Sequence, residues 1–225
     1  MFVLTSVSRV YGAGAQQSVA LHDVSLRVGR GEFVAIAGPS GSGKTTLLNL
    51  VGGIDAPTSG RIEIDGRELS RLAPSDLAEF RLAKLGFVFQ QFSLIPVLTA
   101  AENVELPLLF RKGLAAAERK RAVALALARV GLADKAGRRP AELSGGEQQR
   151  VAVARAVAGN PEIVLADEPT ANLDHETGGA VVALLLALNR ERGTTFLYAT
   201  HDPELVGLAG RVVTLRDGRI TGDVA

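Results

Sequence analysis

The sequence predicts an α/β domain built around a mainly parallel β-sheet, with a helical segment inserted into the chain. Continuous apolar runs at residues 161–168 and 194–202 are typical of strands buried on both faces of a parallel sheet. Residues 92–159 are instead rich in Ala, Leu, Arg and Glu, a composition that favours helices. The α/β core is therefore expected in two sequence pieces, before and after this helical stretch.

The first piece alternates short apolar runs with turns. Its expected strands are residues 18–28, 31–38, 61–66 and 86–90, separated by glycines and charged residues. Residues 43–54 predict a helix that ends at Gly52 and Gly53. In the second piece a helix is expected around residues 180–192, and residues 211–224 predict a closing hairpin with Asp217 and Gly218 at its turn.

Composition narrows the classes of function. The 225 residues, 47% of them hydrophobic, suit one globular domain. With 25 Lys and Arg against 24 Asp and Glu, the net charge of +1 does not indicate a broad nucleic-acid-binding surface. The absence of cysteine excludes disulfides, thiol catalysis and Cys-ligated zinc. Residues 1–12 do not resemble a signal peptide, and the longest aliphatic run, residues 180–188, is too short to span a bilayer.

A phosphate-binding loop is predicted at residues 38–45, GPSGSGKT, which fit the pattern G-x-x-x-x-G-K-[ST] between an apolar strand and a helix. Glycines allow such a loop to wrap a phosphate with its amides, and the helix N-terminus adds partial positive charge. Lys44 is expected to reach the β- and γ-phosphates, and the Thr45 hydroxyl to ligate Mg²⁺. The strand–loop–helix context favours this interpretation, a P-loop NTPase, over an ordinary glycine turn. The predicted loop residues that bind ATP are Gly38, Pro39, Ser40, Gly41, Ser42, Gly43, Lys44, Thr45 and Thr46.

Two adjacent carboxylates, Asp167 and Glu168, end the apolar run 161–168. Neighbouring residues of a strand point to opposite faces, so the two are expected to serve different purposes. Asp167 suits Mg²⁺, directly or through water, and Glu168 suits polarising the attacking water as general base. The alternative is a polar strand end that enters a turn at Pro169.

A second glycine-containing motif, LSGGEQQR at residues 143–150, precedes a predicted helix over residues 148–159. Ser144 and Glu147 have the spacing of a capping box. A plain capped helix does not explain Gly145 and Gly146, because each glycine in a helix costs roughly 1 kcal/mol relative to alanine. A second anion site does explain them, since exposed amides and the Ser144 hydroxyl can hold a phosphate.

Residues 143–156, LSGGEQQRVAVARA, resemble the signature of the ATP-binding cassette (ABC) ATPases, and the resemblance extends over essentially the whole chain. It implies a single domain, with a RecA-like core and N-terminal antiparallel β subdomain in residues 1–90 and 160–225, and a helical signature subdomain in residues 91–159. In this family two nucleotide-binding domains pair head to tail, and each signature segment faces the γ-phosphate bound by the other copy. One such domain per chain implies a homodimer around two ATP.

The resemblance also implies roles for single residues. Tyr11 matches the aromatic that stacks on adenine, and Gln90, with Gln91 as the neighbouring rival, matches the glutamine that contacts Mg²⁺ and the attacking water. Asp174, in the sequence ANLD where the family often has SALD or GNLD, matches a contact to the opposite subunit, and His201 matches the histidine that bonds the γ-phosphate. Taken alone, His201 would more simply be a structural residue, and the alternative for Tyr11 is a partly buried tyrosine near a strand. With Lys44, these positions imply a hydrolysing ATPase that uses Mg²⁺.

Residues 86–108, 163–174 and 200–220 are similar to the ATPases of lipoprotein-release and macrolide-export systems, a group that includes a cell-division relative. This similarity implies a homodimer on the cytoplasmic face of the inner (plasma) membrane, bound to an integral membrane permease subunit. An ABC importer ATPase and a regulatory scaffold of the cell-division type stay open as alternatives. A soluble ABC protein is disfavoured because the chain has neither a second cassette nor a coiled-coil insertion.

Two surface features have less specific interpretations. Phe92, Leu94, Ile95 and Pro96 could form a groove for a helix of the membrane protein, or could pack inside the helical subdomain. The basic run 111–121, with Arg138 and Arg139, could face anionic lipid or could be an ordinary solvated helix face.

Overall fold

Two β-sheets organise the computed structural model, which describes all 225 residues apart from the side chains of Ala15 and Glu204. The larger sheet has the strand order β10-β9-β3-β8-β7-β6, with only β10 antiparallel to its neighbour. The smaller sheet, β2-β1-β4-β5, is antiparallel. The strands are β1 (Phe2–Tyr11), β2 (Ser18–Val28), β3 (Phe33–Ala37), β4 (Ser59–Ile64), β5 (Arg67–Glu68), β6 (Leu85–Val88), β7 (Ile163–Asp167), β8 (Thr195–Thr200), β9 (Arg211–Arg216) and β10 (Arg219–Val224).

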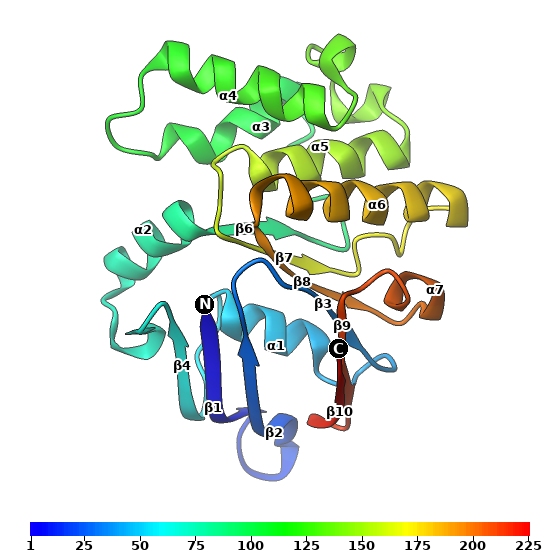
Figure 1. Cartoon of the computed structure of the whole chain (residues 1–225). Helices are drawn as coiled ribbons and strands as arrows, with labels where there is room; N and C mark the ends of the chain where they lie inside the picture. The colour runs from blue at the N-terminus through cyan, green and yellow to red at the C-terminus, as the bar shows by residue number, and fades with distance from the viewer.

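Helices cover both faces of the larger sheet (Figure 1). Helix α1 lies between the two sheets, whereas α5 and α6 cover the opposite face, and α3 and α4 pack against α5 beyond it. The helices are α1 (Lys44–Val51), α2 (Pro74–Lys84), α3 (Ala100–Leu109), α4 (Ala116–Arg129), α5 (Gly145–Val157), α6 (His175–Arg192) and α7 (Pro203–Val206).

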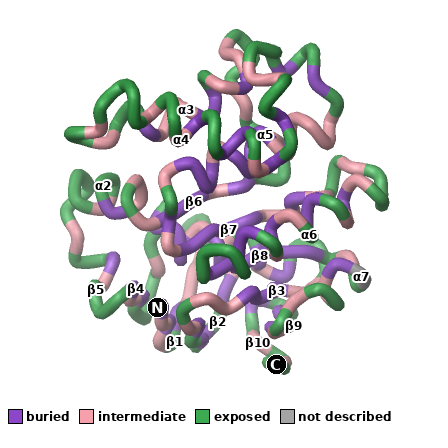
Figure 2. The backbone as a smooth tube through the Cα atoms, turned by 45° about the horizontal axis from the view of Figure 1, so that its top comes forward, coloured by how far each residue is buried: buried purple, intermediate pink, exposed green. Residues whose placement is uncertain are grey.

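The alternation of side chains along the parallel strands creates two hydrophobic cores. In β3, Phe33 and Ala35 face the core shared with α3 to α6, whereas Val34 and Ile36 face the core shared with α1 and the antiparallel sheet. Because both faces are covered, strands β3, β7 and β8 are buried over most of their length (Figure 2). The continuous apolar runs in the sequence have this physical cause.

Most of the expected elements are present, and the differences have local causes. The hairpin β9–β10 turns at Asp217 and Gly218, which have φ of 48° and 72°, as a type I′ turn requires. Helix α6 begins at His175, before the expected residue 180, because the Asp174 side chain accepts a hydrogen bond from the Thr177 amide and caps it. Strand β1 and helix α2 were not predicted, although Pro74 at the first turn of α2 is a recognisable start signal.

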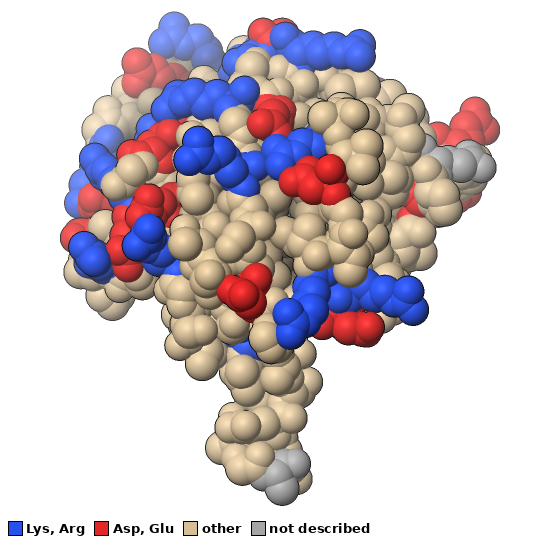
Figure 3. All heavy atoms as spheres, turned by 60° about the horizontal axis from the view of Figure 1, so that its bottom comes forward, with Lys and Arg blue, Asp and Glu red and all other residues tan. Residues whose placement is uncertain are grey.

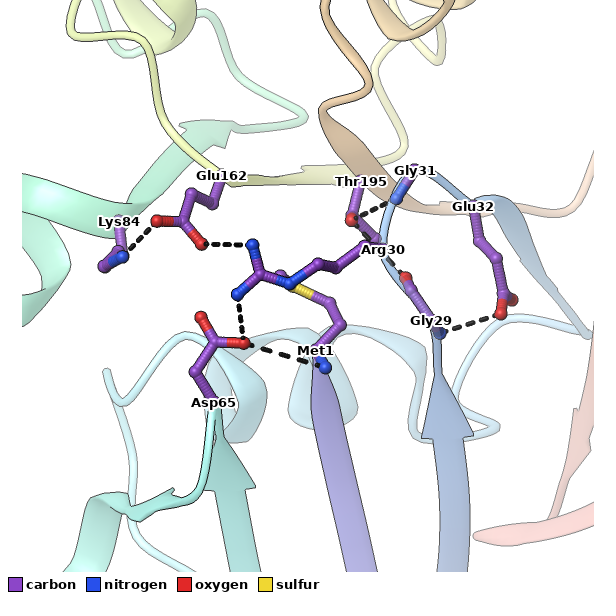
Figure 4. Close-up of polar contacts among 9 residues, drawn as sticks. All are labelled: Met1, Gly29, Arg30, Gly31, Glu32, Asp65, Lys84, Glu162 and Thr195. Carbon is purple, nitrogen blue, oxygen red and sulfur yellow. Dashed lines mark hydrogen bonds and ion pairs between the residues drawn. The ribbon is translucent and has the colours of Figure 1, made fainter.

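A polar network joins the two sheets at the end of β3 that lies away from the phosphate loop (Figure 4). Arg30, just before β3, pairs with Asp65 of the smaller sheet at 2.8 Å and with Glu162, just before β7, at 3.6 Å. Glu162 also pairs with Lys84, and the Met1 ammonium lies 3.7 Å from Asp65. This network fixes the antiparallel sheet against the core that positions the functional residues.

The surface is mixed in charge. On the face presented in Figure 3, Lys and Arg are interspersed with Asp and Glu. Among the described residues, no helix combines the length and the apolarity that crossing a bilayer requires.

Candidate nucleotide-binding and hydrolysis site

The loop between β3 and α1 depends on its glycines. Gly41 and Gly43 have φ of 79° and 104°, in the left-handed region that favours glycine. A methyl group on Gly38 would lie 2.1 Å from the Leu215 carbonyl oxygen, and one on Gly43 would lie 2.5 Å from that of Ala20. No side chain caps α1, so its first amides stay available for an anion.

Lys44 projects into this loop and is only 5% exposed. Its ammonium donates hydrogen bonds to the carbonyl oxygens of Gly38, at 2.8 Å, and Pro39, at 3.0 Å. Its Nζ also lies 3.5 Å from Oε1 of Glu168. Lys44 and Glu168, which were predicted from separate motifs, therefore lie in contact.

The backbone at Glu168 departs from the strand geometry that the sequence analysis assumed. Strand β7 ends at Asp167, and Glu168 has a φ of 43°, with its amide bonded to the carbonyl of Ala199 at 3.0 Å. Glu168 therefore does not follow the strand alternation on which the different directions of the two carboxylates were predicted, and both carboxylates interact with Lys44. Oε2 of Glu168 lies 2.8 Å from Nδ1 of His201, which follows β8. The carboxylate is held between an ammonium and an imidazole.

Asp167 is the group best suited to a hard cation. Burial raises the pKa of its carboxyl and the nearby charge of Glu168 adds to this, while a hydrogen bond with the Thr45 side chain and the charge of Lys44 act the other way. Its Oδ1 is buried and has no hydrogen-bond partner among the described residues. A buried, unpaired carboxylate oxygen beside a threonine hydroxyl fits Mg²⁺, which prefers oxygen ligands and needs few from the protein when phosphates supply the rest.

Where side chains are described, no group of three or more His, Cys, Asp or Glu could hold a metal. A magnesium ion at Asp167 and Thr45 would thus rely on nucleotide oxygens. Ser42 Oγ, within the loop, is likewise buried without a hydrogen-bond partner in the described structure. The loop and the end of β7 therefore hold polar atoms that their own fold does not satisfy.

The remaining predicted residues, Gln90 and Tyr11, lie at or just beyond the ends of β6 and β1. Gln90 and Gln91 follow β6, both exposed, and the carbonyl of Gln90 accepts a hydrogen bond from Asn172 Nδ2 at 2.9 Å. Tyr11 ends β1, is 38% exposed, donates to Asp55 at 2.8 Å, and has the Arg9 guanidinium 4.5 Å from its ring centroid. Tyr11 is thus held in place while part of its ring is open to solvent.

The signature segment forms the N-terminus of α5. The capping box is complete: the Ser144 amide donates to Glu147 Oε2 at 2.9 Å, and the Glu147 amide donates to Ser144 Oγ at 3.3 Å. Of the four amides that helix geometry leaves without an intrahelical partner, only those of Gly145 and Gly146 are not used by this box. Gly146 also has a packing reason, because a methyl group there would lie 2.4 Å from Cγ2 of Thr177.

Three contacts near the site were not foreseen from the sequence. Asp174 caps α6, and the hydrogen bonds from Thr177 lower the pKa of its carboxyl. Asn172, in the same loop, bonds to Gln90. Gln149, on α5, donates to the Pro169 carbonyl. The sequence signal for Gln149 is a polar residue at the buried side of an otherwise apolar helix face.

An apolar groove does lie beside β6, but other residues line it than the four expected ones. Its cavity, of about 420 Å³, lies among α2, β6, α3 and α5. Leu94 instead packs against the helical core. The lining residues are Ala78, Arg81, Leu82, Leu85, Gly86, Phe87, Phe89, Leu106, Pro107, Leu108, Phe110, Arg111, Arg155, Ala156, Gly159 and Pro161, with no carboxylate among them.

The basic residues that could face lipid are largely engaged within the chain. Arg111 donates to the Leu82 carbonyl at 3.0 Å, and burial lowers its pKa. Lys112 pairs with Glu79, Arg119 with Glu105 and Arg138 with Glu142. These pairs favour the alternative of an ordinary solvated helix face.

Comparison with known proteins identifies the family to which this architecture belongs. The model of the ABC transporter family matches residues 21–171. The macrolide export ATP-binding/permease protein MacB of Burkholderia pseudomallei (strain K96243) is 48% identical over 220 residues, 98% of this chain and 33% of that protein. The protein MJ0796 of Methanocaldococcus jannaschii, an ABC transporter ATP-binding protein, is 46% identical over 223 residues, 98% of this chain and 95% of that one. The chain thus spans about a third of the MacB relatives and nearly all of MJ0796.

Solved structures agree with this assignment. The dimeric structure of a post-hydrolysis state of MJ0796 bound to ADP and Pi has a TM-score of 0.91 and 45% identity, covering 99% of this chain and 97% of that one. CbiO1 from Clostridium perfringens, part of the ABC transporter complex cbiONQ, has a TM-score of 0.89 and 29% identity, covering 99% and 87%. These matches confirm the predicted P-loop NTPase fold class. The chain belongs to the ABC transporter family, as an ATP-binding cassette that hydrolyses ATP.

Proposed function

We propose that two copies of this chain close around two ATP molecules and thereby drive a membrane protein of the macrolide-export or lipoprotein-release type. The observation that carries the chemistry is the placement of Glu168 between Lys44 Nζ, at 3.5 Å, and His201 Nδ1, at 2.8 Å. A carboxylate oriented by two neighbours at the edge of a phosphate-binding loop is suited to polarise a water molecule against the γ-phosphate. Glu168 is thus the general base, and His201 orients it and bonds the phosphate.

Within one copy, the loop from Gly38 to Thr46 holds the phosphates, Lys44 neutralises the β- and γ-phosphate oxygens, and Tyr11 stacks on the adenine. Asp167, Thr45 and Gln90 would hold Mg²⁺, with Asp167 acting directly or through water. The ion supplies charge neutralisation on the phosphate oxygens.

The second copy contributes its signature segment. Because the capping box uses the amides of Ser144 and Glu147, the amides of Gly145 and Gly146 are the donors left for a γ-phosphate. The dimeric state of MJ0796 in its post-hydrolysis structure supports such a pairing here. Asp174 lies in the loop that would face the second copy.

The membrane protein docks in the groove beside β6. The groove combines apolar side chains such as Phe89 and Phe110, which is 69% exposed, with the guanidinium groups of Arg81 and Arg111. This lining suits an amphipathic helix of a permease. The chain would then act peripherally, at the cytoplasmic face of the membrane, with residues 91–159 moving as the helical subdomain against a core of residues 1–90 and 160–225.

The export branch is favoured by the 48% identity to MacB over 98% of this chain. The test is to purify the tagged chain from its native membrane in mild detergent and to identify what accompanies it. A four-span protein with a large extracytoplasmic domain is expected. A many-span permease with a solute-binding protein would indicate an importer instead, and a cell-wall hydrolase activator would indicate the regulatory scaffold.

A further inference from the structure

A glutamine on α5 touches the backbone next to the catalytic carboxylate. Gln149 is 0% exposed, and its Nε2 donates to the carbonyl oxygen of Pro169 at 2.5 Å. Pro169 follows Glu168 directly. The helix that begins at the signature segment is therefore bonded to the first carbonyl after the proposed general base.

The turn at Glu168 needs such restraints. Its φ of 43° is unfavourable for a residue with a long side chain, and such a conformation persists only where the surroundings determine it. Two restraints come from nearby backbone: the Glu168 amide bonds to Ala199 at 3.0 Å, and the Ala171 amide bonds to the Glu168 carbonyl at 3.2 Å. The bond from Gln149 is the restraint that comes from the helical layer.

Packing alone does not explain the glutamine. Its Oε1 is buried and has no hydrogen-bond partner among the described residues, which disfavours an amide at this position relative to an apolar side chain of the same size. The hydrogen bond that the amide group donates is therefore the reason for a glutamine at this position. Its acceptor is the Pro169 carbonyl.

The start of α5 contacts the same loop at two further points. A methyl group on Gly145 would lie 3.6 Å from Leu173, and one on Gly146 would lie 2.4 Å from Thr177, so both glycines approach residues 170–177 closely. The first two turns of α5 therefore meet the segment that follows Glu168 along its length.

We infer that Gln149 is a positioning residue through which α5 sets the location of Glu168. Engagement of the signature segment by a phosphate is thereby transmitted to the general base in the same chain. The inference rests on the proposed roles of Glu168 and the signature segment. It assigns Gln149 no contact with nucleotide or water.

The test uses Gln149→Met, which keeps the volume and removes the donor, and Gln149→Asn, which keeps the amide but shortens its reach. Both are compared with the unchanged chain for kcat, KM for ATP, melting temperature and amide hydrogen exchange over residues 168–173. We expect kcat to fall about tenfold, because a small displacement of a catalytic group has an effect of this order, with KM within about twofold. Exchange of the Glu168 and Ala171 amides should become faster.

Asn189→Leu is the matched control. Asn189 is also a buried amide that donates to backbone carbonyls, those of Gly31 and Thr194, but it lies at the opposite end of the sheet. It should lower the melting temperature and leave kcat unchanged. A Gln149→Met chain with wild-type kcat, or with a loss no larger than that of Asn189→Leu, overturns the inference. If Gln149→Met does not fold, Gln149→Asn decides by the same criteria.

Glu168→Gln, measured in the same series, distinguishes failure of the proposed role of Glu168 from failure of the proposed role of Gln149. If it keeps wild-type turnover, the proposed role of Glu168 fails, and the inference fails with it. If it is inactive while Gln149→Met and Gln149→Asn are normal, only the inference fails.

Discussion

The loop over residues 38–45 and the signature segment over residues 143–147, the two proposed phosphate sites, differ in how many of their polar groups the described structure satisfies. Around the phosphate loop, Ser42 Oγ and Asp167 Oδ1 are buried without hydrogen-bond partners in the described structure, and two glycines adopt left-handed conformations. At the signature segment, Ser144 and Glu147 satisfy each other in a complete capping box. In the loop, buried polar atoms remain for a ligand to satisfy. At the signature segment the helix end is capped, and only the amides of Gly145 and Gly146 remain unused by the capping box.

Two kinds of candidate phosphate site can be distinguished on this basis. Buried polar atoms without partners mark the site where a ligand completes the structure. Backbone amides without partners at an otherwise capped helix end mark a site that is folded without its ligand and can contact a ligand bound to another copy. Removing a group from the loop should thus affect binding within one copy, whereas changing the signature should affect only the assembled dimer.

Glu168→Gln should reduce ATP turnover more than any other change considered below. Turnover should fall about a thousandfold, since general base catalysis contributes on the order of 10² to 10⁴. With ATP and Mg²⁺, the variant should elute as a dimer in size-exclusion chromatography. Glu162→Gln is the matched control, because Glu162 lies just before the same strand but pairs with Lys84 and Arg30. A monomeric Glu168→Gln chain would contradict both the role of Glu168 and the closed dimer.

Asp167→Asn should lower turnover by about a hundredfold, because it weakens the proposed magnesium ligand. The same change should stabilise the ligand-free chain at neutral pH. Burial raises the pKa of Asp167, so the native state binds this proton more tightly than the unfolded chain, and stability falls as the pH rises above the ordinary carboxyl pKa. Asparagine removes this loss.

Calorimetry from pH 5 to pH 8 tests the expectation for Asp167→Asn. The variant should melt at a higher temperature than the unchanged chain at pH 8, because it lacks the carboxyl group whose pKa burial raises. The gap between the two chains should shrink as the pH falls. A variant that melts lower than the unchanged chain at pH 8 would show that the carboxylate stabilises the fold.

Gly145→Glu tests the signature side of the comparison. A side chain at Gly145 meets only ordinary contacts, the nearest at 3.6 Å, so the chain should fold, but a carboxylate there would repel a phosphate. Turnover should fall about a hundredfold, while ATP affinity of the single copy is unchanged. Gly137→Glu, at an exposed position with nothing within 4 Å, is the control. If the single Gly145→Glu copy lost ATP affinity, the signature segment would affect ATP binding within one copy, and the proposed difference between the two motifs would be wrong.

The smallest effect is expected for Tyr11→Ala. Loss of a stacking platform should weaken ATP binding about fivefold, since stacking of a base on an aromatic ring contributes roughly 1 kcal/mol or more. Titration with a fluorescent ATP analogue measures this change. Tyr11→Phe keeps the ring but loses the hydrogen bond to Asp55, and it should bind nearly as well as the unchanged chain. Equal affinities for all three chains would leave Tyr11 a structural residue.

Sequence reasoning located the parallel strands and the phosphate loop because both depend on local patterns. Apolar runs reveal burial on two faces, and the spacing of Gly38, Gly43 and Lys44 is fixed by the geometry of wrapping a phosphate. The backbone turn at Glu168 could not be predicted, because strand alternation carries no signal for a left-handed residue at the strand end. The Gln149–Pro169 bond joins residues 20 positions apart, and only the packing of α5 against the sheet creates it.

The left-handed backbone at Glu168 also bears on how this chain can evolve. Glycine and asparagine adopt a positive φ more readily than glutamate does, by about 1 kcal/mol for such a turn. Selection for heat resistance alone should therefore favour Glu168→Gly or Glu168→Asn, both of which lack the carboxylate proposed as the general base. A library of Glu168 variants that is screened only for folding would enrich inactive chains. The same library screened for turnover would retain glutamate, although glutamate makes the fold less stable.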